Sequence, residues 1–185
     1  MDRKGFVILF TGIGIGIIIG YLLAVIILQG KAAKETVKPG FESTVENELE
    51  KFVGQKREEL ANNPGNIQAR IDLANMLFDL GRDREAAEQY VLALGKQPDN
   101  PNVLSDLGVC YRRMKEPKKA IEYFNKVVEK DTQHMVAWYN IAVTSYYDLK
   151  DITTARNALY KAMKIDPFYE NAIRLKAALD VAERK

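Results

Sequence analysis

Few residues in this chain of 185 residues are suited to nucleophilic or metal chemistry. There is one cysteine, Cys110, and one histidine, His134. A lone cysteine excludes an internal disulfide framework and a cysteine-based zinc site, and a lone histidine excludes a multi-histidine metal site within one chain. Cys110 stands in an apolar stretch, which favours a buried, inert thiol over a nucleophile. The sequence therefore predicts no cofactor, no metal and no enzyme activity.

The charged residues indicate binding rather than catalysis. Adjacent Arg112 and Arg113 offer planar donor forks that match carboxylates. Asp148 and Asp151 are interpreted as solvated charges near a turn, not as an acid–base pair. Over the whole chain 27 basic residues balance 25 acidic ones, and the formal net charge is +2. This balance argues against a nucleic-acid partner held by bulk electrostatics.

The chain opens with a long apolar segment. Residues 6–28 carry no charge, and at about 1.5 Å per residue a helix of this length spans a bilayer core of roughly 30 Å. The run is longer than the apolar core of a cleaved signal peptide, and no convincing cleavage site follows it. We therefore expect a signal-anchor transmembrane helix within residues 1–30. Lys31, Lys34 and Lys38 follow the run, and a count of nearby Lys and Arg alone slightly favours a cytoplasmic C-terminal side. Against this, Arg3 and Lys4 form a typical n-region, which favours an inside N-terminus and a soluble part on the extracytoplasmic side of the inner or cell membrane.

Small residues recur every fourth position along this apolar run. They are Gly12, Gly16, Gly20 and Ala24, and they share one face of a helix. Such a face lets two transmembrane helices approach closely. It predicts a packing face for self-association or for another transmembrane subunit, although glycine is also simply common in membrane helices.

A polar tether separates the apolar run from the rest. Residues 31–41 contain Pro39-Gly40 and are expected to be a linker. Ser43 or Thr44 can cap a helix, and Glu46, three residues after Ser43, gives the pattern of a capping box. We therefore expect a leading amphipathic helix within residues 42–66, ended by the Asn62-Asn63-Pro64-Gly65 sequence.

The remainder of the chain is an internal repeat. Small, large and turn-forming residues return at spacings of 34 and then 35 residues. The three matching segments are Ala86-x3-Tyr90-x2-Ala93-x4-Pro98, Ala120-x3-Phe124-x2-Val127-x4-Thr132 and Ala155-x3-Leu159-x2-Ala162-x4-Pro167. Each copy also has an upstream apolar helix pattern, so each copy is expected to be two amphipathic helices joined by a short polar turn.

These segments resemble the tetratricopeptide repeat (TPR), whose pattern is W-x2-L-G-x2-Y, then A-x3-F-x2-A, then P. The second copy, with LSDLGVCY followed by AIEYFNKV, is the cleanest match. The resemblance implies an all-α solenoid of three helix pairs: TPR 1 at 67–100, TPR 2 at 101–134 and TPR 3 at 135–169. Residues 170–185 are then a terminal solvating helix. The third copy carries one extra residue between Trp138 and Leu149, which predicts either a π-bulge or a longer turn.

The resemblance also implies a binding surface, because the first helix of each TPR copy lines a concave groove in the family. The corresponding positions selected here are Asn75, Phe78, Asp79, Ser105, Val109, Arg112, Arg113, Tyr139, Val143 and Tyr146. Their mixture of aromatic, apolar and basic side chains favours a protein or peptide partner, with an acidic group near the two arginines. The specialised carboxylate clamp of chaperone adaptors is not expected, because Ile71 and Val109 stand where that clamp needs lysine and asparagine.

The whole pattern is similar to that of bacterial single-span TPR proteins. It predicts a membrane-anchored, non-enzymatic scaffold or adaptor that holds a protein partner in its groove, within or next to a membrane complex, in an assembly, biogenesis or chaperone-like role. The alternative is a structural subunit of a membrane complex, held mainly by the glycine-rich helix and the outer surface of the solenoid. Neither interpretation involves nucleic acid.

Overall fold

The computed structural model describes residues 39–182, and in this range the chain is all α-helical. The helices are α2 (Pro39–Asn62), α3 (Ile67–Asp79), α4 (Asp83–Leu94), α5 (Pro101–Arg113), α6 (Pro117–Lys130), α7 (Met135–Val143), the π-helix η2 (Thr144–Leu149), α8 (Ile152–Ile165) and α9 (Glu170–Ala182). The chain divides into two compact units, Met1–Asn47 and Glu48–Lys185. The second unit contains the three expected helix pairs.

The apolar run 6–28 and its small residues Gly12, Gly16, Gly20 and Ala24 lie outside the described residues. Within the range that the structure describes, no helix is both long enough and apolar enough to cross a membrane. The transmembrane helix and its packing face therefore stay predictions from the sequence.

Helix α2 begins earlier than expected. Its first residue is Pro39, which the sequence analysis placed in the linker. Proline is favoured in the first turn of a helix, because the N–H it lacks has no partner there in any case. Ser43 is then inside the helix, so the predicted capping box is wrong. In the second unit α2 buries Val53 and Leu60 against the first copy. Glu50 of α2 also forms an ion pair with Arg82, in the turn of that copy.

The first helices of the three pairs begin at Ile67, Pro101 and Met135. Each of these helices starts where a side chain of the preceding residue accepts a hydrogen bond from the backbone. Asn66 and Asn100 do this through their amide oxygens, and His134 does it through Nδ1, at 3.2 Å from the nitrogen of Ala137. Capping satisfies one of the N–H groups that a helix start leaves without a partner.

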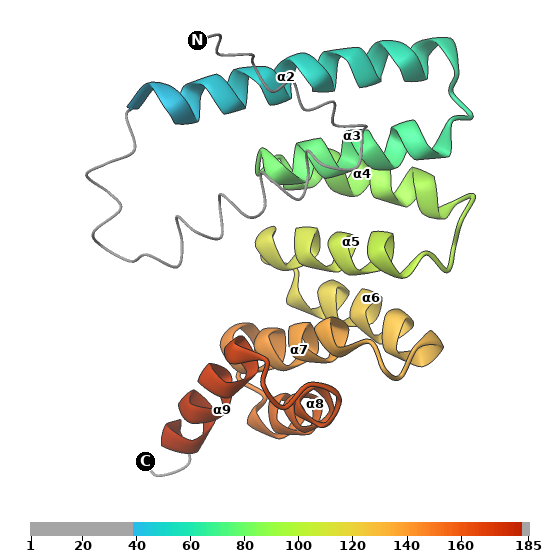
Figure 1. Cartoon of the computed structure of the whole chain (residues 1–185). Coiled ribbons are helices and arrows are strands. Elements are labelled where there is room, and N and C mark those ends of the chain that lie inside the picture. Colours follow the sequence, from blue (N-terminus) through green and yellow to red (C-terminus); the bar gives the residue numbers. More distant parts are fainter. Residues whose placement is uncertain (1–38, 183–185) are drawn as a thin grey trace, which may run out of the picture. The chain divides into compact units, whose positions relative to one another are not determined.

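Each helix packs on the next along the chain from α3 to α8, and α9 packs on α8 (Figure 1). The apolar core runs through this stack as two clusters. One extends from Val53 to Cys110 and the other from Leu104 to Leu179, so that α5 contributes to both. One helix pair cannot bury its own apolar face, and stacking supplies the missing partner. The buried part of α9, with Ala172, Leu175 and Leu179, covers the last pair as predicted for the terminal helix.

Two helices approach closely in the second copy. A Cβ atom at Gly108 would lie 2.5 Å from Cε1 of Phe124, whose ring fills the space against α5. The other two copies have alanine at this position, Ala74 and Ala142, and both are fully buried. A fully buried aromatic ring in α6 thus requires the glycine in α5.

The turn inside each copy has one left-handed residue. Gly81, Lys115 and Lys150 have φ angles of 71°, 64° and 59°. Beyond each of them a backbone N–H bonds back over the end of the helix: Arg82 to the carbonyl of Leu77, Glu116 to Tyr111 and Asp151 to Ser145. This arrangement satisfies carbonyls that a helix end leaves free. Glycine meets this requirement without strain only in the first copy.

The extra residue of the third copy forms a π-helix. η2 covers Thr144–Leu149 and continues directly from α7, and only Lys150 and Asp151 separate it from α8. The π-bulge is therefore the correct one of the two alternatives, and the turn is not lengthened.

Gly108→Ala tests the close approach in the second copy. Alanine favours a helix by about 1 kcal/mol over glycine, but the clash with Phe124 is expected to outweigh this gain and to lower the free energy of unfolding by about 1–3 kcal/mol. Combining it with Phe124→Leu should cost less than the sum of the two single changes, because leucine frees the space. Chemical denaturation of the full-length chain in mild detergent measures this. Strict additivity would contradict the proposed clash.

Candidate functional site

The side chains selected for the groove come from α3, α5, α7 and η2, and we call the surface they form the first-helix face. It is defined by Asn75, Phe78, Asp79, Asp106, Val109, Arg112, Arg113, Tyr139, Tyr146, Tyr147 and Asp148. Side-chain contacts join its helices, since α5 is bonded to α3 and to η2 through its arginines. Eight of these eleven residues were selected from the sequence as groove positions, and Asp148 was interpreted there as a solvated charge. Asp106 was missed, and Tyr147 was left out of the selected set.

Two selected residues do not belong to this face. Ser105 and Val143 are each only 8% exposed. Val143 lies in the buried run Ile141–Ser145, because the adjoining η2 packs against both α6 and α8. Ser105 lies in α5 with its side chain buried, and its hydroxyl has no hydrogen-bond partner among the described residues. Neither side chain is available to a partner, so their assignment to the binding surface is wrong.

Arg112 already has an acidic partner within the chain. Its Nε donates to Oδ2 of Asp148, which lies in η2, 36 residues along the sequence. The two side chains are 35% and 22% exposed, so water screens this pair only in part. Asp148 is thus not the freely solvated charge that the sequence predicted. The π-helix that places Asp148 here neutralises one of the two arginines.

Arg113 is held in a similar way by the first copy. Its Nη1 donates to Oδ1 of Asp83 at 3.2 Å and to the carbonyl oxygen of Phe78 at 3.3 Å. Its guanidinium carbon lies 4.0 Å from the centre of the Phe78 ring, a cation–π contact. The predicted acidic ligand for Arg113 would therefore compete with three contacts that the folded chain already makes.

Two carboxylates nearby are compensated only in part, through the charge of Arg113. Burial raises the pKa of Asp106 to about 6, with repulsion from Asp79 adding to the effect and Arg113 opposing it. The pKa of Asp79 is also raised, mainly by partial burial of its carboxyl, although Arg113 lowers it. Neither side chain forms an ion pair with a described residue. Asp79 in α3 and Asp106 in α5 thus form a negative region on the first-helix face. No motif in the sequence marked Asp106, because only the folded arrangement of the first two copies brings it near enough to Asp79 for the two charges to interact.

Tyrosines dominate the C-terminal part of the face. The ring of Tyr146 stands edge-on to that of Tyr147, with 4.7 Å between their centres, and its hydroxyl donates to the carbonyl oxygen of Ala178 in α9. Tyr139 makes a similar contact with Tyr169, which follows α8. A hollow of about 290 Å³ opens between Tyr146, Tyr147, Lys150 and Ile152. In these four residues the face offers aromatic and apolar surface next to one lysine.

Asn75 is engaged inside the first copy. Its side-chain oxygen accepts a hydrogen bond of 2.7 Å from the hydroxyl of Tyr90. Burial, together with nearby acidic groups, strongly raises the pKa of this hydroxyl, so Tyr90 stays protonated and keeps donating. The amide nitrogen of Asn75 remains the part of this side chain that can serve a ligand.

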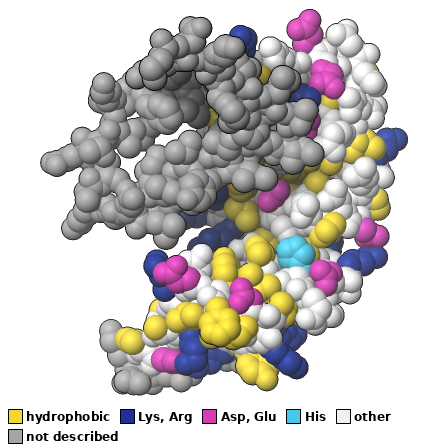
Figure 2. All heavy atoms as spheres, in the orientation of Figure 1, with side chains coloured by type: hydrophobic (Ala, Val, Ile, Leu, Met, Phe, Trp, Pro, Cys, Tyr) yellow, Lys and Arg dark blue, Asp and Glu magenta, His cyan; other side chains and the backbone are white. Residues whose placement is uncertain are grey.

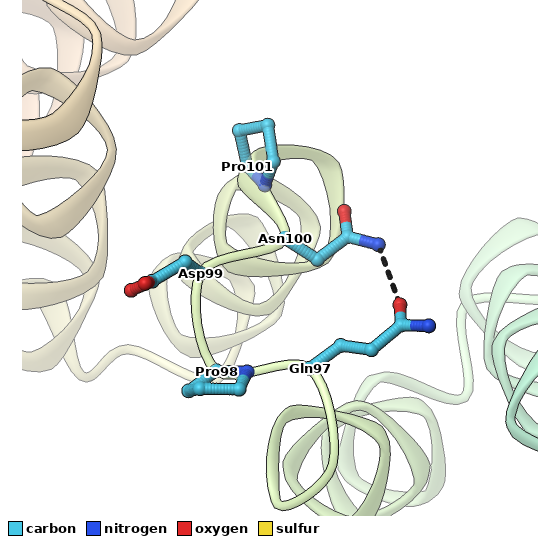
Figure 3. Close-up of a pocket in the computed structure, with 5 residues that line it drawn as sticks. All are labelled: Gln97, Pro98, Asp99, Asn100 and Pro101. Atoms are coloured by element: carbon cyan, nitrogen blue, oxygen red, sulfur yellow. Dashed lines mark hydrogen bonds between the residues drawn. The ribbon is translucent and has the colours of Figure 1, made fainter.

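A second hollow, of about 400 Å³, lies at the turn between α4 and α5. Figure 3 shows the amide of Asn100 turned towards Gln97, at 3.2 Å, while Asp99 points to the other side. Asp99 pairs with Lys130 at 3.2 Å, and Asn100 also caps α5. The polar groups of this hollow are used by the turn itself, which makes it a poor binding site.

Cys110 and His134 have structural surroundings. Cys110 is fully buried, and burial raises the pKa of its thiol to about 12, so the reactive thiolate is scarce at neutral pH. The side chain of His134 caps α7. Within residues 39–182 no group of acidic, histidine and cysteine side chains has the arrangement of a metal site.

Comparisons with known proteins agree with this architecture. The family model of the anaphase-promoting complex (cyclosome) subunit 3 matches residues 86–162, less than half of the chain. The human protein O-mannosyl-transferase TMTC3 is 28% identical over 112 residues, which are 60% of this chain and 12% of that protein. This chain thus spans about an eighth of the length of that relative.

Solved structures extend the match. MamA superposes with a TM-score of 0.70 at 16% identity, covering 80% of this chain and 85% of MamA. The first TPR domain of Spaghetti (RPAP3), bound to the HSP90 peptide SRMEEVD, gives a TM-score of 0.61 at 18% identity, covering 64% of this chain and 94% of that domain. The described part of this chain has the TPR-type solenoid fold. At these identities the likeness shows the fold alone. The residues of the first-helix face are those of this chain and are not inferred from its neighbours.

Asp106→Asn tests how much the partial burial of this charged carboxylate in the second TPR copy lowers the stability of the fold. The pKa of Asp106 is raised on folding, so folding favours its protonated form and wild-type stability falls as the pH rises from about 4 to about 6. The neutral amide removes this penalty. We expect the substitution to stabilise the chain by on the order of 1–2 kcal/mol at pH 7, which is a rise of a few degrees in Tm, and to change little at pH 3.5.

Thermal unfolding followed by circular dichroism at the two pH values checks this. The other titratable or charged groups that face the same region are left unchanged in this variant. They are Asp79, Tyr90, Cys110 and Arg113. Asp99→Asn, at an exposed turn, is the matched control and should have a small effect at both pH values. A loss of stability at pH 7 in the Asp106 variant would contradict the assigned burial penalty.

Proposed function

We propose that the chain is a membrane-anchored, non-enzymatic TPR scaffold that holds a protein or peptide segment against its first-helix face. The observation that carries this proposal is the composition of that face. Three consecutive first helices present aromatic, amide and charged groups outside the core, among them Phe78, Asp79, Arg113 and Tyr147. Rigid aromatic area combined with polar groups suits peptide recognition.

The neighbouring structures support a peptide as the class of partner. TPR domains of RPAP3 are described with an HSP90 peptide and with an HSP70 peptide. Catalysis is left out of the proposal for a chemical reason: burial holds the Cys110 thiol protonated, and His134 is used as a helix cap. The name of the human relative refers to a transferase, but this chain covers only 12% of that protein.

The membrane part of the proposal rests on the sequence. Residues 6–28 are long and uncharged enough to span a bilayer, and residues 31–38 lead from them to α2. We propose a single span with the N-terminus inside and the TPR unit on the extracytoplasmic side. The anchor would keep the bound partner close to the membrane, within or next to a membrane complex.

A second candidate is a structural subunit of a membrane complex. It is favoured by the apolar residues left exposed on the second helices and after them. Leu92 and Tyr160 are 54% and 70% exposed, and Phe168 is 86% exposed. Figure 2 shows hydrophobic side chains gathered over the lower part of the solenoid among charged ones. In this case the outer surface and the glycine-rich helix would carry the contacts.

Two matched double variants separate the candidates. Phe78→Ala with Tyr147→Ala alters the first-helix face, and Leu92→Ala with Tyr160→Ala removes comparable apolar groups from the second helices. Affinity capture of the full-length chain in mild detergent, with mass spectrometry, compares their partners. We expect the first variant to lose at least about 10-fold of the principal partner and the second to keep it. Circular dichroism confirms that both are folded.

The reverse result would favour the structural subunit. Gly16→Leu with Gly20→Leu then examines the predicted transmembrane packing face, because leucine blocks close helix approach. Loss of the partner in this variant alone would indicate a contact within the membrane and would contradict binding at the first-helix face.

A further inference from the structure

We propose that the hollow beside η2 receives one bulky apolar side chain of a partner segment, and that Lys150 binds a carboxylate next to that side chain. The walls of the hollow are Tyr146, Tyr147, Lys150 and Ile152, and its volume is about 290 Å³. This inference rests on the proposed function, since it specifies one contact of the segment that the first-helix face would hold. It moves the predicted acidic group of the partner from the two paired arginines of α5 to the turn of the third copy.

Corresponding side chains of neighbouring copies contact one another along the first-helix face. The ring of Phe78 in α3 is covered by the guanidinium of Arg113 in α5, 35 residues later. In the same row, Arg112 of α5 is bonded to Asp148 of η2, 36 residues later. Phe78 and Arg112 each lie three residues before the left-handed residue of their own turn. Each side chain in this row thus has a partner from the next copy.

Tyr147 is the third member of this row, and no such partner for it exists among the described residues. It lies three residues before Lys150, the left-handed residue of the third turn. The next helix in the place of a first helix is α9, where Ala182 has the same spacing from Tyr147 as Arg113 has from Phe78. The hydroxyl of Tyr146 bonds to the carbonyl oxygen of Ala178, so the C-terminal part of α9 lies beside η2. An alanine at position 182 is too short to cover the ring.

The hollow beside this ring has mainly apolar walls. Tyr147 and Ile152 are 49% and 37% exposed. Ile152 is the first residue of α8, whereas α4 and α6 begin with Asp83 and Pro117, so the repeat does not require an exposed aliphatic side chain there. The ring of Tyr146 stands edge-on to that of Tyr147, and its hydroxyl is already bonded to α9. The walls therefore suit an apolar group.

The size of the hollow suits one side chain rather than a whole small molecule. Pockets for drug-sized ligands usually measure about 300–1,000 Å³, and this hollow lies just below that range. A leucine or phenylalanine side chain placed against Tyr147 and Ile152 would remove apolar surface of both partners from water. The occupant would then be an anchor residue of a longer segment bound along the first-helix face.

Lys150 adds a positive charge that no described carboxylate pairs with. Its Nζ donates to the carbonyl oxygen of Tyr147 at 2.8 Å, which leaves two protons of the ammonium for a ligand. The nearby carboxylates have other partners, since Asp148 pairs with Arg112 and Asp151 accepts a hydrogen bond from the backbone of Thr154. A carboxylate beside the anchor residue complements this charge, and a cationic group there would be repelled.

Synthetic 12-residue peptides test the proposal. One central residue is fixed as phenylalanine, leucine or serine, the next residue is fixed as glutamate, glutamine or lysine, and the other positions are randomised over small uncharged residues. Fluorescence polarisation measures their binding to the full-length chain in mild detergent, at low and at physiological salt. We expect the phenylalanine–glutamate and leucine–glutamate sets to bind about 10-fold more strongly than the serine–glutamate and phenylalanine–lysine sets. Salt should reduce only the preference for glutamate.

Matched variants locate the two halves of the contact. Tyr147→Ala should abolish the preference for phenylalanine, whereas Tyr160→Ala removes the same side chain from an exposed position of α8 and should leave it intact. Lys150→Gln should abolish the preference for glutamate. Lys115→Gln is its control, because Lys115 has the same charge and the same left-handed backbone in the turn of the second copy. Circular dichroism checks that each variant is folded.

A variant that fills the row gives an independent test. Ala182→Leu places a larger side chain where the row lacks one, and it should lower the affinity of the phenylalanine–glutamate set by about 5-fold through competition for the ring of Tyr147. Ala177→Leu makes the same change at an exposed position of α9 and should not alter binding. Equal affinities of the two variants would contradict the place assigned to the anchor residue.

The remaining outcomes separate the inference from the function on which it rests. Peptide binding that does not depend on Tyr147 or Lys150, or a preference for lysine beside the anchor, would overturn the inference and leave peptide binding standing. Absence of binding to every set would contradict the proposed function itself. Stronger peptide binding after removal of residues 183–185 would make the chain's own end the occupant and would also overturn the inference.

Discussion

The distance between the two helices of a copy is the constraint on which the rest of this structure depends. In the second copy the Phe124 ring occupies the space that a side chain at Gly108 would need. The other copies keep an alanine at that position. The apolar residues that one pair leaves uncovered pack against the next pair, so the copies stack along the chain.

The sequence predicted the architecture of the repeats well, because the architecture depends on local periodicity. Small residues every 34 or 35 positions, with a polar turn between apolar stretches, were enough to place the three helix pairs and the terminal helix. The start of α2 was missed because Ser43 and Glu46 form a plausible cap, whereas Pro39 is an equally good first-turn residue. Counting residues showed that TPR 3 has one too many, but only the backbone distinguishes a π-helix from a longer turn.

The candidate site was harder to predict, since its electrostatics depend on residues far apart in the sequence. Arg112 and Asp148 are 36 positions apart, and Arg113 and Asp83 are 30 apart. Family positions identified the arginines as groove residues without revealing that both are neutralised. They also selected Ser105 and Val143, which packing buries. Asp106 had no motif to mark it, and its raised pKa arises first from burial and then from Asp79 on another copy.

The division of the core into two apolar clusters has a consequence for folding. The clusters meet at α5, where Leu107 and Cys110 belong to one and Leu104 to the other. Leu94 of α4 and Tyr123 of α6 also pack against both clusters, so the two halves of the core meet around α5, a helix of 13 residues. In a linear array, cooperativity is limited by its weakest interface. Amide hydrogens of α7 to α9 should accordingly exchange as one group and those of α3 and α4 as another, with α5 the last helix to open.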